Sequence, residues 1–213
     1  EEDQVYFITA KGGVEELYKL TGMVKKDIKN VMILGGSKVG YKTARDLCDK
    51  RFNVKLIEKN KEKAFDLADQ LPNALIINGD GRNVELLEEE SLESMDAFIA
   101  VTGNSETNIM SCLVAKSKHI KKTIALVENM DYFQLSHSIG IDTLINKKLL
   151  AANNIFRHIR KGEVVALTRL NNLNAEILEF IVKPDSAVNG KIIKELDFPR
   201  EATIGGVIQN GTG

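Results

Sequence analysis

The sequence predicts an α/β protein built on a doubly wound parallel sheet of about six strands, followed by the start of a small α+β domain. Three observations predict this fold. Short apolar runs alternate with amphipathic helical segments between Asn30 and Asn146, as in successive βαβ units. The first run leads directly into a glycine-rich turn at 35–40, and the second ends in the acidic residue Glu58.

The expected strands are nearly continuous apolar runs, which are typical of a parallel sheet that helices cover on both faces. These runs are Val31–Leu34, Val54–Ile57, Leu75–Ile77, Ala97–Val101, Thr123–Val127 and Thr143–Ile145. After the glycine-rich turn, Val39, Thr43 and Leu47 recur at helical spacing. This periodicity predicts that a helix follows the turn.

The chain is expected to contain four segments: residues 1–22 as the tail of a preceding domain, 23–145 as the α/β domain built on this sheet, 146–161 as a linker helix, and 162–213 as a partial small domain. Strand-like runs occur at Val5–Thr9, Glu163–Leu170, Ile177–Val182 and Thr203–Ile208. The segment 162–213 stops before a sheet closes, and 1–22 is too short to form a domain alone. Both ends are therefore expected to be cut from a longer protein.

The segment 146–161 carries an apolar stripe at helical spacing, formed by Leu149, Ala152, Phe156 and Ile159. Such a stripe packs on the helix's own sheet or meets a partner subunit. The residues leave both interpretations open.

Composition excludes several classes of function. The net charge is −1, from 29 basic and 30 acidic residues, so neither nucleic acid nor an anionic membrane surface is favoured as a partner. No apolar run approaches the roughly 18 residues that a membrane-spanning helix requires, so direct membrane insertion is not expected. Cys48 and Cys112 form no CxxC pair, and we expect them to be reduced core thiols of a cytoplasmic protein rather than metal ligands.

The turn Gly35-Gly36-Ser37-Lys38-Val39-Gly40 lies between an expected strand and an expected helix, which is the context of a dinucleotide-binding fingerprint. Gly35 permits the tight turn, Gly40 lets the helix pack closely, and the amides at the helix start hold a pyrophosphate. Ser37 replaces the middle glycine of the fingerprint, although its hydroxyl is able to donate to a phosphate. A P-loop is excluded because Tyr41 separates Gly40 from Lys42. The context therefore predicts a Rossmann-type nucleotide-binding module.

Glu58 ends the second strand, 18 residues after Gly40, where an acid binds the ribose hydroxyls of a dinucleotide. A carboxylate at this place repels a 2′-phosphate, which favours NAD or an adenosine nucleotide over NADP. The neighbouring Lys59 weakens that preference. The alternative is that Glu58 is a solvated strand end.

Two further strand ends carry polar residues, Asn78-Gly79-Asp80-Gly81 and Thr102-Gly103-Asn104-Ser105-Glu106. Ligands in open α/β sheets bind outside the carboxyl ends of the strands, although Asp80, Asn104 and Ser105 are equally suited to capping helices. The candidate nucleotide-binding residues are Gly35, Gly36, Ser37, Lys38, Val39, Gly40, Glu58, Lys59, Asp80, Gly81, Thr102, Gly103, Asn104 and Glu106. We expect no metal ligand or catalytic residue among them.

The combination of Gly35–Gly40, Glu58, Gly79-Asp80, Ala100-Val101-Thr102 and Glu106-Thr107-Asn108 resembles the TrkA family. These proteins are regulatory subunits of bacterial Trk potassium uptake systems and are built from RCK-type (regulator of potassium conductance) domains. The resemblance covers nearly the whole chain. It departs from the family pattern at Ser37, at Gly81-Arg82 and at Leu126.

The resemblance implies a tandem arrangement of Rossmann (TrkA-N) and small (TrkA-C) domains, with 1–22 and 162–213 as TrkA-C-like parts. It implies no enzymatic activity, but binding of NAD or NADH, or alternatively ATP or ADP, at the cytoplasmic side of an integral-membrane potassium channel subunit of the Trk type. Glu58 would hold the ribose, Asp80 and Thr102 would lie near the adenosine, and Gly35–Gly40 would cradle the phosphates.

The resemblance also implies a homo-dimer or a larger RCK ring. The apolar stripe of 146–161 and the helix around 108–116 are the expected contact surfaces. The protein would then be cytoplasmic and peripheral at the inner face of the membrane, where the channel holds it.

Two alternatives remain open. A copy that departs from the family at Ser37 and Leu126 is also consistent with an assembly scaffold that has lost nucleotide binding. An NAD-dependent oxidoreductase is less favoured because it needs a proton donor such as a Tyr/Lys pair. No tyrosine is followed by lysine four residues later, and we interpret all three histidines as structural or solvated: His119, His137 and His158.

Overall fold

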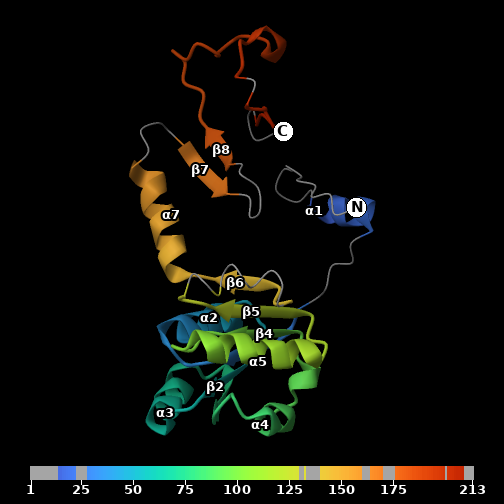
Figure 1. The fold of residues 1–213 in the computed structure, drawn as a ribbon, viewed down its shortest axis with the longest axis vertical. Coiled ribbons are helices and arrows are strands. Elements are labelled where there is room, and N and C mark those ends of the chain that lie inside the picture. The colour runs from blue at the N-terminus through green and yellow to red at the C-terminus, as the bar shows by residue number, and fades with distance from the viewer. Residues whose placement is uncertain are drawn as a thin grey trace. The chain divides into compact units, whose positions relative to one another are not determined.

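The computed structural model of this chain divides into two compact units, residues 26–158 and residues 1–25 with 159–213 (Figure 1). It describes residues 14–22, 28–129, 132, 140–159, 164–169, 176–199 and 201–208. No helix within these ranges is long and apolar enough to cross a membrane.

The larger unit is built on a six-stranded sheet in the order β3-β2-β1-β4-β5-β6, with every neighbouring pair parallel. This order is that of a doubly wound fold and confirms the predicted fold class. The strands are β1 (Asn30–Leu34), β2 (Asn53–Glu58), β3 (Ala74–Asn78), β4 (Ala97–Ala100), β5 (Lys122–Leu126) and β6 (Thr143–Ile145). All six expected strands of this unit are present, and each observed strand end lies within one residue of the expected end.

Helices cover both faces of this sheet, as the continuous apolar strands predict. Alternate residues of β1 point to opposite faces, so Val31 and Ile33 join one buried cluster, and Met32 and Leu34 join the other. The helices of the unit are α2 (Lys38–Asp49), α3 (Lys61–Gln70), α4 (Val84–Glu89), the 3₁₀ turn η1 (Leu92–Ser94), α5 (Ser105–Ser117) and α7 (Lys147–Ile159).

Helix α7 corresponds to the predicted linker helix, and its stripe remains only partly defined. Leu149 is half-buried and Ala152 is exposed. The side chains of Phe156 and Ile159 lie outside the described part of the chain, so both interpretations of the stripe stay open.

The other unit contains α1 (Val14–Thr21), an antiparallel pair formed by β7 (Val164–Arg169) and β8 (Glu176–Phe180), and the 3₁₀ turn η2 (Ile193–Glu195). The strand predicted at Thr203–Ile208 is wrong, because these residues have no regular secondary structure. Within the described ranges nothing pairs with this segment, and Ile208 is 68% exposed. A strand requires a hydrogen-bonded neighbour, which an apolar sequence pattern alone does not supply. The strand predicted at Val5–Thr9 lies outside the described residues.

Candidate functional site

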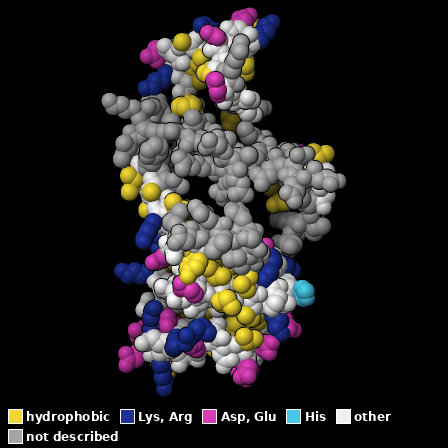
Figure 2. Space-filling model, in the orientation of Figure 1, with side chains coloured by type: hydrophobic (Ala, Val, Ile, Leu, Met, Phe, Trp, Pro, Cys, Tyr) yellow, Lys and Arg dark blue, Asp and Glu magenta, His cyan; other side chains and the backbone are white. Residues whose placement is uncertain are grey.

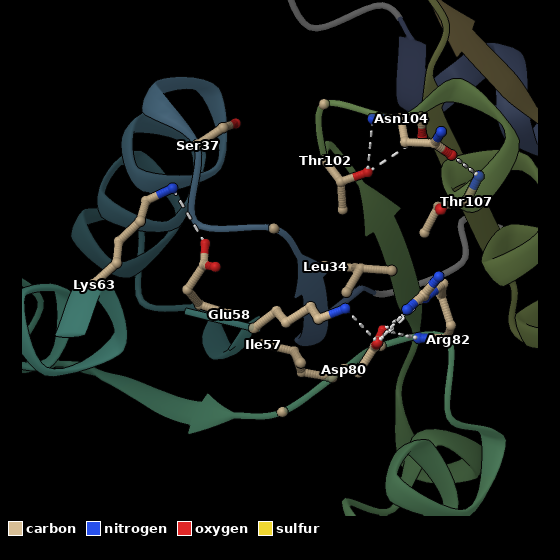
Figure 3. A pocket seen from close by; sticks show the side chains of 15 residues that line it. Leu34, Ser37, Ile57, Glu58, Lys63, Asp80, Arg82, Thr102, Asn104 and Thr107 are labelled. Carbon is tan, nitrogen blue, oxygen red and sulfur yellow. Dashed lines mark hydrogen bonds and ion pairs between the residues drawn. The ribbon is translucent and has the colours of Figure 1, made fainter. Parts of the chain in front are cut away.

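A cleft of about 370 Å³ opens at the carboxyl ends of β1, β2, β3 and β4 (Figure 3). Its position is the one at which open α/β sheets bind ligands. Nine of the candidate residues line it: Gly35, Ser37, Glu58, Lys59, Asp80, Gly81, Thr102, Gly103 and Asn104. The other lining residues were not among the candidates: Leu34, Ile57, Lys63, Gly79, Arg82 and Thr107.

The remaining five candidates do not line the cleft. Gly36 is buried, Lys38 is exposed at the first residue of α2, and Val39 packs against the sheet. Gly40 is buried in the first turn of α2, and Glu106 is exposed in the first turn of α5.

The turn after β1 requires glycine at both of its ends. Gly35 has φ +102°, and a Cβ at this residue would lie 2.9 Å from the backbone nitrogen of Thr102. At Gly40 a Cβ would lie 1.9 Å from the carbonyl oxygen of Gly35. The turn and helix α2 therefore pack more closely than any side chain permits, as the fingerprint predicts.

Ser37 is the N-cap of α2. Its Oγ accepts the backbone N–H of Gly40 at 3.3 Å and donates to the carbonyl oxygen of Val101 at 2.9 Å. Since a hydroxyl has one proton, Ser37 gives that proton to the end of β4 in this structure. The serine at the fingerprint's middle position thus ties the glycine turn to the end of the neighbouring strand β4.

Glu58 turns its carboxylate back over the glycine turn (Figure 3). Oε2 accepts the backbone N–H of Gly36 at 2.9 Å and lies 3.2 Å from Nζ of Lys63, while Oε1 accepts the N–H of Asn60 at 2.9 Å. Burial alone would raise the pKa of Glu58, but the hydrogen bonds from Asn60, Lys63 and Gly36 outweigh burial and lower it. With a side chain that is only 11% exposed, Glu58 is not a solvated strand end.

Asp80 is paired with two cations. Nε of Arg82 donates to Oδ1 at 3.1 Å and to Oδ2 at 3.2 Å, and Nη2 of Arg82 donates to Oδ2 at 2.7 Å. Nζ of Lys59 lies 3.0 Å from Oδ2. The hydrogen bonds from Arg82 and then Lys59 hold the pKa of Asp80 well below its usual range. Asp80 does not cap α4, because the N-cap of that helix is Asn83.

Asn104, in contrast, does cap a helix. Its side chain accepts the N–H of Thr107 at 2.6 Å at the start of α5. Ser105 is the first residue of α5, and its Oγ accepts the N–H of Glu128 at 3.0 Å. The start of α5 is thereby fixed beside the cleft, which Asn104 and Thr107 line.

The thiols and the described histidine lie away from this cleft. Cys112 is buried, and burial raises the pKa of its thiol to about 12. Cys48 is half-buried, and burial together with Asp49 raises its pKa as well. Both cysteines are free thiols in this structure. His119 is exposed, whereas His137 and the side chain of His158 lie outside the described part.

The family model described as "TrkA-N domain" matches residues 31–147. This match covers more than half of the chain and includes every residue that lines the cleft. The chain belongs to the TrkA-N domain family.

Curated relatives of this TrkA-N protein are named "Trk system potassium uptake protein TrkA". The relative from Vibrio alginolyticus is 31% identical over 98% of this chain and 46% of its own length. The relative from Halomonas elongata is 32% identical over the same shares. The chain thus spans about half the length of the curated relatives it matches.

Solved structures share the fold at low sequence identity. The TrkA-N domain of the inner membrane protein ybaL from Escherichia coli gives a TM-score of 0.57 at 15% identity, covering 64% of this chain and 100% of that domain. The GsuK channel bound to NAD gives a TM-score of 0.55 at 17% identity, covering 70% of this chain and 26% of the GsuK chain. GsuK bound to ADP gives a TM-score of 0.52 at 15% identity, covering 68% of this chain and 39% of that chain.

Proposed function

We propose that this chain is the nucleotide-binding part of a cytoplasmic regulatory subunit of a potassium uptake channel. Membership of the TrkA-N family and relatives named as Trk potassium uptake proteins support this proposal. The observation that carries it is the cleft at the carboxyl ends of four strands. The largely buried carboxylate of Glu58, the N-terminus of α2 and several cationic side chains converge there.

The cleft has groups suited to each part of an adenine dinucleotide. The start of α2 offers backbone amides and the positive end of a helix dipole to a pyrophosphate. Lys59, Lys63 and Arg82 line the same cleft and add positive charge for phosphate oxygens. The ionised carboxylate of Glu58 is an acceptor for ribose hydroxyls. Asp80 and Thr102 would border the adenosine.

We propose NAD or NADH as the ligand, with ATP or ADP as the alternative. GsuK has been solved with NAD and with ADP, and both molecules contain the adenosine ribose that Glu58 is suited to bind. A 2′-phosphate would meet the charge of Glu58 at close range, so NADP is disfavoured.

In the proposed mechanism the nucleotides have different affinities for two assembly states of the protein. Such a difference shifts the equilibrium between the states and thereby couples nucleotide state to channel gating. The partner is an integral-membrane potassium channel of the Trk type, which would hold this subunit at the inner face of the membrane. No chemical conversion of the nucleotide is part of this mechanism.

We further propose assembly into a homo-dimer or a larger ring. Hydrophobic side chains gather over α5 on one face of the larger unit (Figure 2). Helix α5 includes Met110, whose side chain is 61% exposed. On α7, Leu150 and Ile155 are exposed as well. Exposed apolar groups on two helices are typical of subunit interfaces. Residues 1–22 and 162–213 would belong to TrkA-C-like domains on either side of the TrkA-N domain.

A scaffold copy without nucleotide binding is the second candidate, and one observation favours it. The carboxylate of Glu58 and the hydroxyl of Ser37 already have partners within the chain. A ligand must replace part of these interactions, which reduces its net affinity.

Calorimetric titration of the 213-residue chain with NAD, NADH, ATP and ADP separates the two candidates. Saturable binding of one nucleotide, with a different affinity for its counterpart, is the result expected for a sensor. Absence of binding by all four would instead assign the scaffold role to this chain.

A further inference from the structure

Helix α5 presents buried polar side chains to the sheet. Of the four buried polar residues in the described part of the chain, Asn108 and Ser111 lie on this one helix. Asn108 is 1% exposed and Ser111 is 4% exposed. Burying a polar side chain is unfavourable unless it is hydrogen-bonded, so the partners of these two residues indicate what they contribute.

Asn108 joins the ends of two strands. Its Oδ1 accepts the backbone N–H of Thr102 at 3.0 Å and the hydroxyl of Thr102 at 2.6 Å. Its Nδ2 donates to the carbonyl oxygen of Thr102 at 3.1 Å and to that of Leu126 at 2.8 Å. The side chain therefore uses both protons and both acceptor sites of its amide.

Thr102 is itself part of the cleft. Its hydroxyl accepts the N–H of Asn104 at 3.2 Å, so the loop from 102 to 104 is fixed through Thr102. Thr102 makes three hydrogen bonds with Asn108, and the fourth bond of Asn108 anchors the loop to the end of β5. One side chain thus sets where this wall of the cleft lies.

Ser111 makes a similar connection to the loop that follows β3. Its Oγ donates to the carbonyl oxygen of Gly81 at 3.3 Å, and Gly81 also lines the cleft. The two residues lie three apart, on one face of α5. A single helix therefore holds the loops that follow β3 and β4.

We propose that Asn108 is a positioning residue for nucleotide binding, assisted by Ser111. Neither residue lines the cleft. They hold the Thr102–Asn104 loop and Gly81 at a fixed separation, so the adenosine side of the cleft is already formed before the ligand arrives. Preorganisation of this kind raises affinity because the ligand does not have to order the loop. This inference rests on the proposed function of the cleft.

The test compares Asn108→Ala with Cys112→Ala in the 213-residue chain. Cys112 is a suitable control because it is buried on the same helix, and its thiol donates to the carbonyl oxygen of Ile124 at 3.4 Å, a residue that does not line the cleft. The affinity for NAD, NADH, ATP and ADP is measured by calorimetry, together with thermal unfolding. Amide-resolved hydrogen exchange of Thr102 and Asn104 is measured in the ligand-free chain.

Asn108→Ala is expected to weaken nucleotide binding about tenfold and to speed exchange at Thr102 and Asn104, since the bonds that fix the loop are lost. Cys112→Ala is expected to lower the unfolding temperature while leaving affinity and exchange at these amides as in the wild type. If Asn108→Ala does not fold, Ser111→Ala decides instead, with an expected loss of about threefold. Affinity in Asn108→Ala equal to that of Cys112→Ala would overturn the positioning role.

Failure of the proposed function has a different signature. Absence of binding by the wild type to all four nucleotides would refute that function. In that case unchanged exchange at Thr102 and Asn104 in Asn108→Ala would also overturn the positioning of the loop, and faster exchange would support it.

Discussion

The backbone nitrogen of Gly36 lies 2.9 Å from Oε2 of Glu58, so the acid at the end of β2 bonds directly to the glycine turn that follows β1. Two fingerprint elements that are 22 residues apart in sequence thus form one unit in space. In the proposed function, a ligand that bound Glu58 through its ribose would also be placed with its phosphates against this turn. The geometry accounts for the pairing of a glycine turn with a distant acid.

Replacement of Glu58 by alanine is expected to weaken adenine nucleotide binding about tenfold, because a charge-assisted hydrogen bond to the ribose is lost. Calorimetric titration measures the change. Glu62→Ala is the matched control, since Glu62 is an exposed acid in the first turn of α3. Unchanged affinity in Glu58→Ala would remove Glu58 from the site.

Gly40→Ala is expected to lower the free energy of unfolding by about 3 kcal/mol, because the new Cβ overlaps rigid backbone. That Cβ would lie 1.9 Å from the carbonyl oxygen of Gly35. At Gly103 a Cβ meets nothing within 4 Å, so Gly103→Ala is expected to change stability by less than about 0.5 kcal/mol. Urea unfolding of the two variants provides the comparison, and equal stabilities would contradict the close packing inferred for the turn.

Ser37 allows a test of the departure from the glycine fingerprint. Ser37→Ala is expected to cost about 1 kcal/mol of stability through loss of the helix cap. Ser37→Gly is expected to bind nucleotide at least as tightly as the wild type, because the serine proton is donated to Val101 rather than to the cleft. A clear loss of affinity in Ser37→Gly, measured by calorimetry, would contradict this expectation.

Asp96 provides a prediction for the dependence of stability on pH. Its carboxylate pairs with Lys121 and accepts the backbone N–H groups of Asn30 and Lys29. These interactions, that with Lys121 first, lower the pKa of Asp96 from 3.8 to about 2. A lowered pKa in the folded state stabilises the protein above the unfolded pKa, and this stabilisation is lost as the pH falls toward the folded value.

Asp96→Asn is therefore expected to be less stable than the wild type at pH 7, by about 1–2 kcal/mol. The difference should shrink as the pH falls from about 4 to about 2. Thermal unfolding across this range measures it, with the exposed Asp66→Asn on α3 as control. A difference that stays constant with pH would rule out the ionised carboxylate as its source.

The fold was predictable because a sheet that is covered on both faces leaves a strong signal. Each strand is then an almost unbroken apolar run, and Val31–Leu34 and Val54–Ile57 were identified in this way. Glu58 was predictable because the fingerprint fixes its spacing from Gly40. The same approach failed at Thr203–Ile208, where an apolar pattern exists but the described residues provide no strand to pair with it.

Some residues that line the cleft were not predicted from the sequence, because the local turns determine where their side chains point. Lys63 reaches Glu58 only because α3 begins directly after β2. Arg82 reaches Asp80 because the loop before α4 folds back on itself. Leu34 and Ile57 had a usable signal, since the last apolar residue of a parallel strand borders the crevice at its end. Asn108 appeared within the family pattern, but sequence alone does not show that its amide joins two strands.

Every residue that lines the cleft lies between Leu34 and Thr107, and all of them belong to the unit formed by residues 26–158. The site is therefore inherited as one continuous stretch of sequence. A duplication that copied residues 26–158 would copy the cleft together with Asn108 and Ser111, which hold its loops. One copy would then be able to keep its ligand while the other accumulated changes without loss of the ancestral activity.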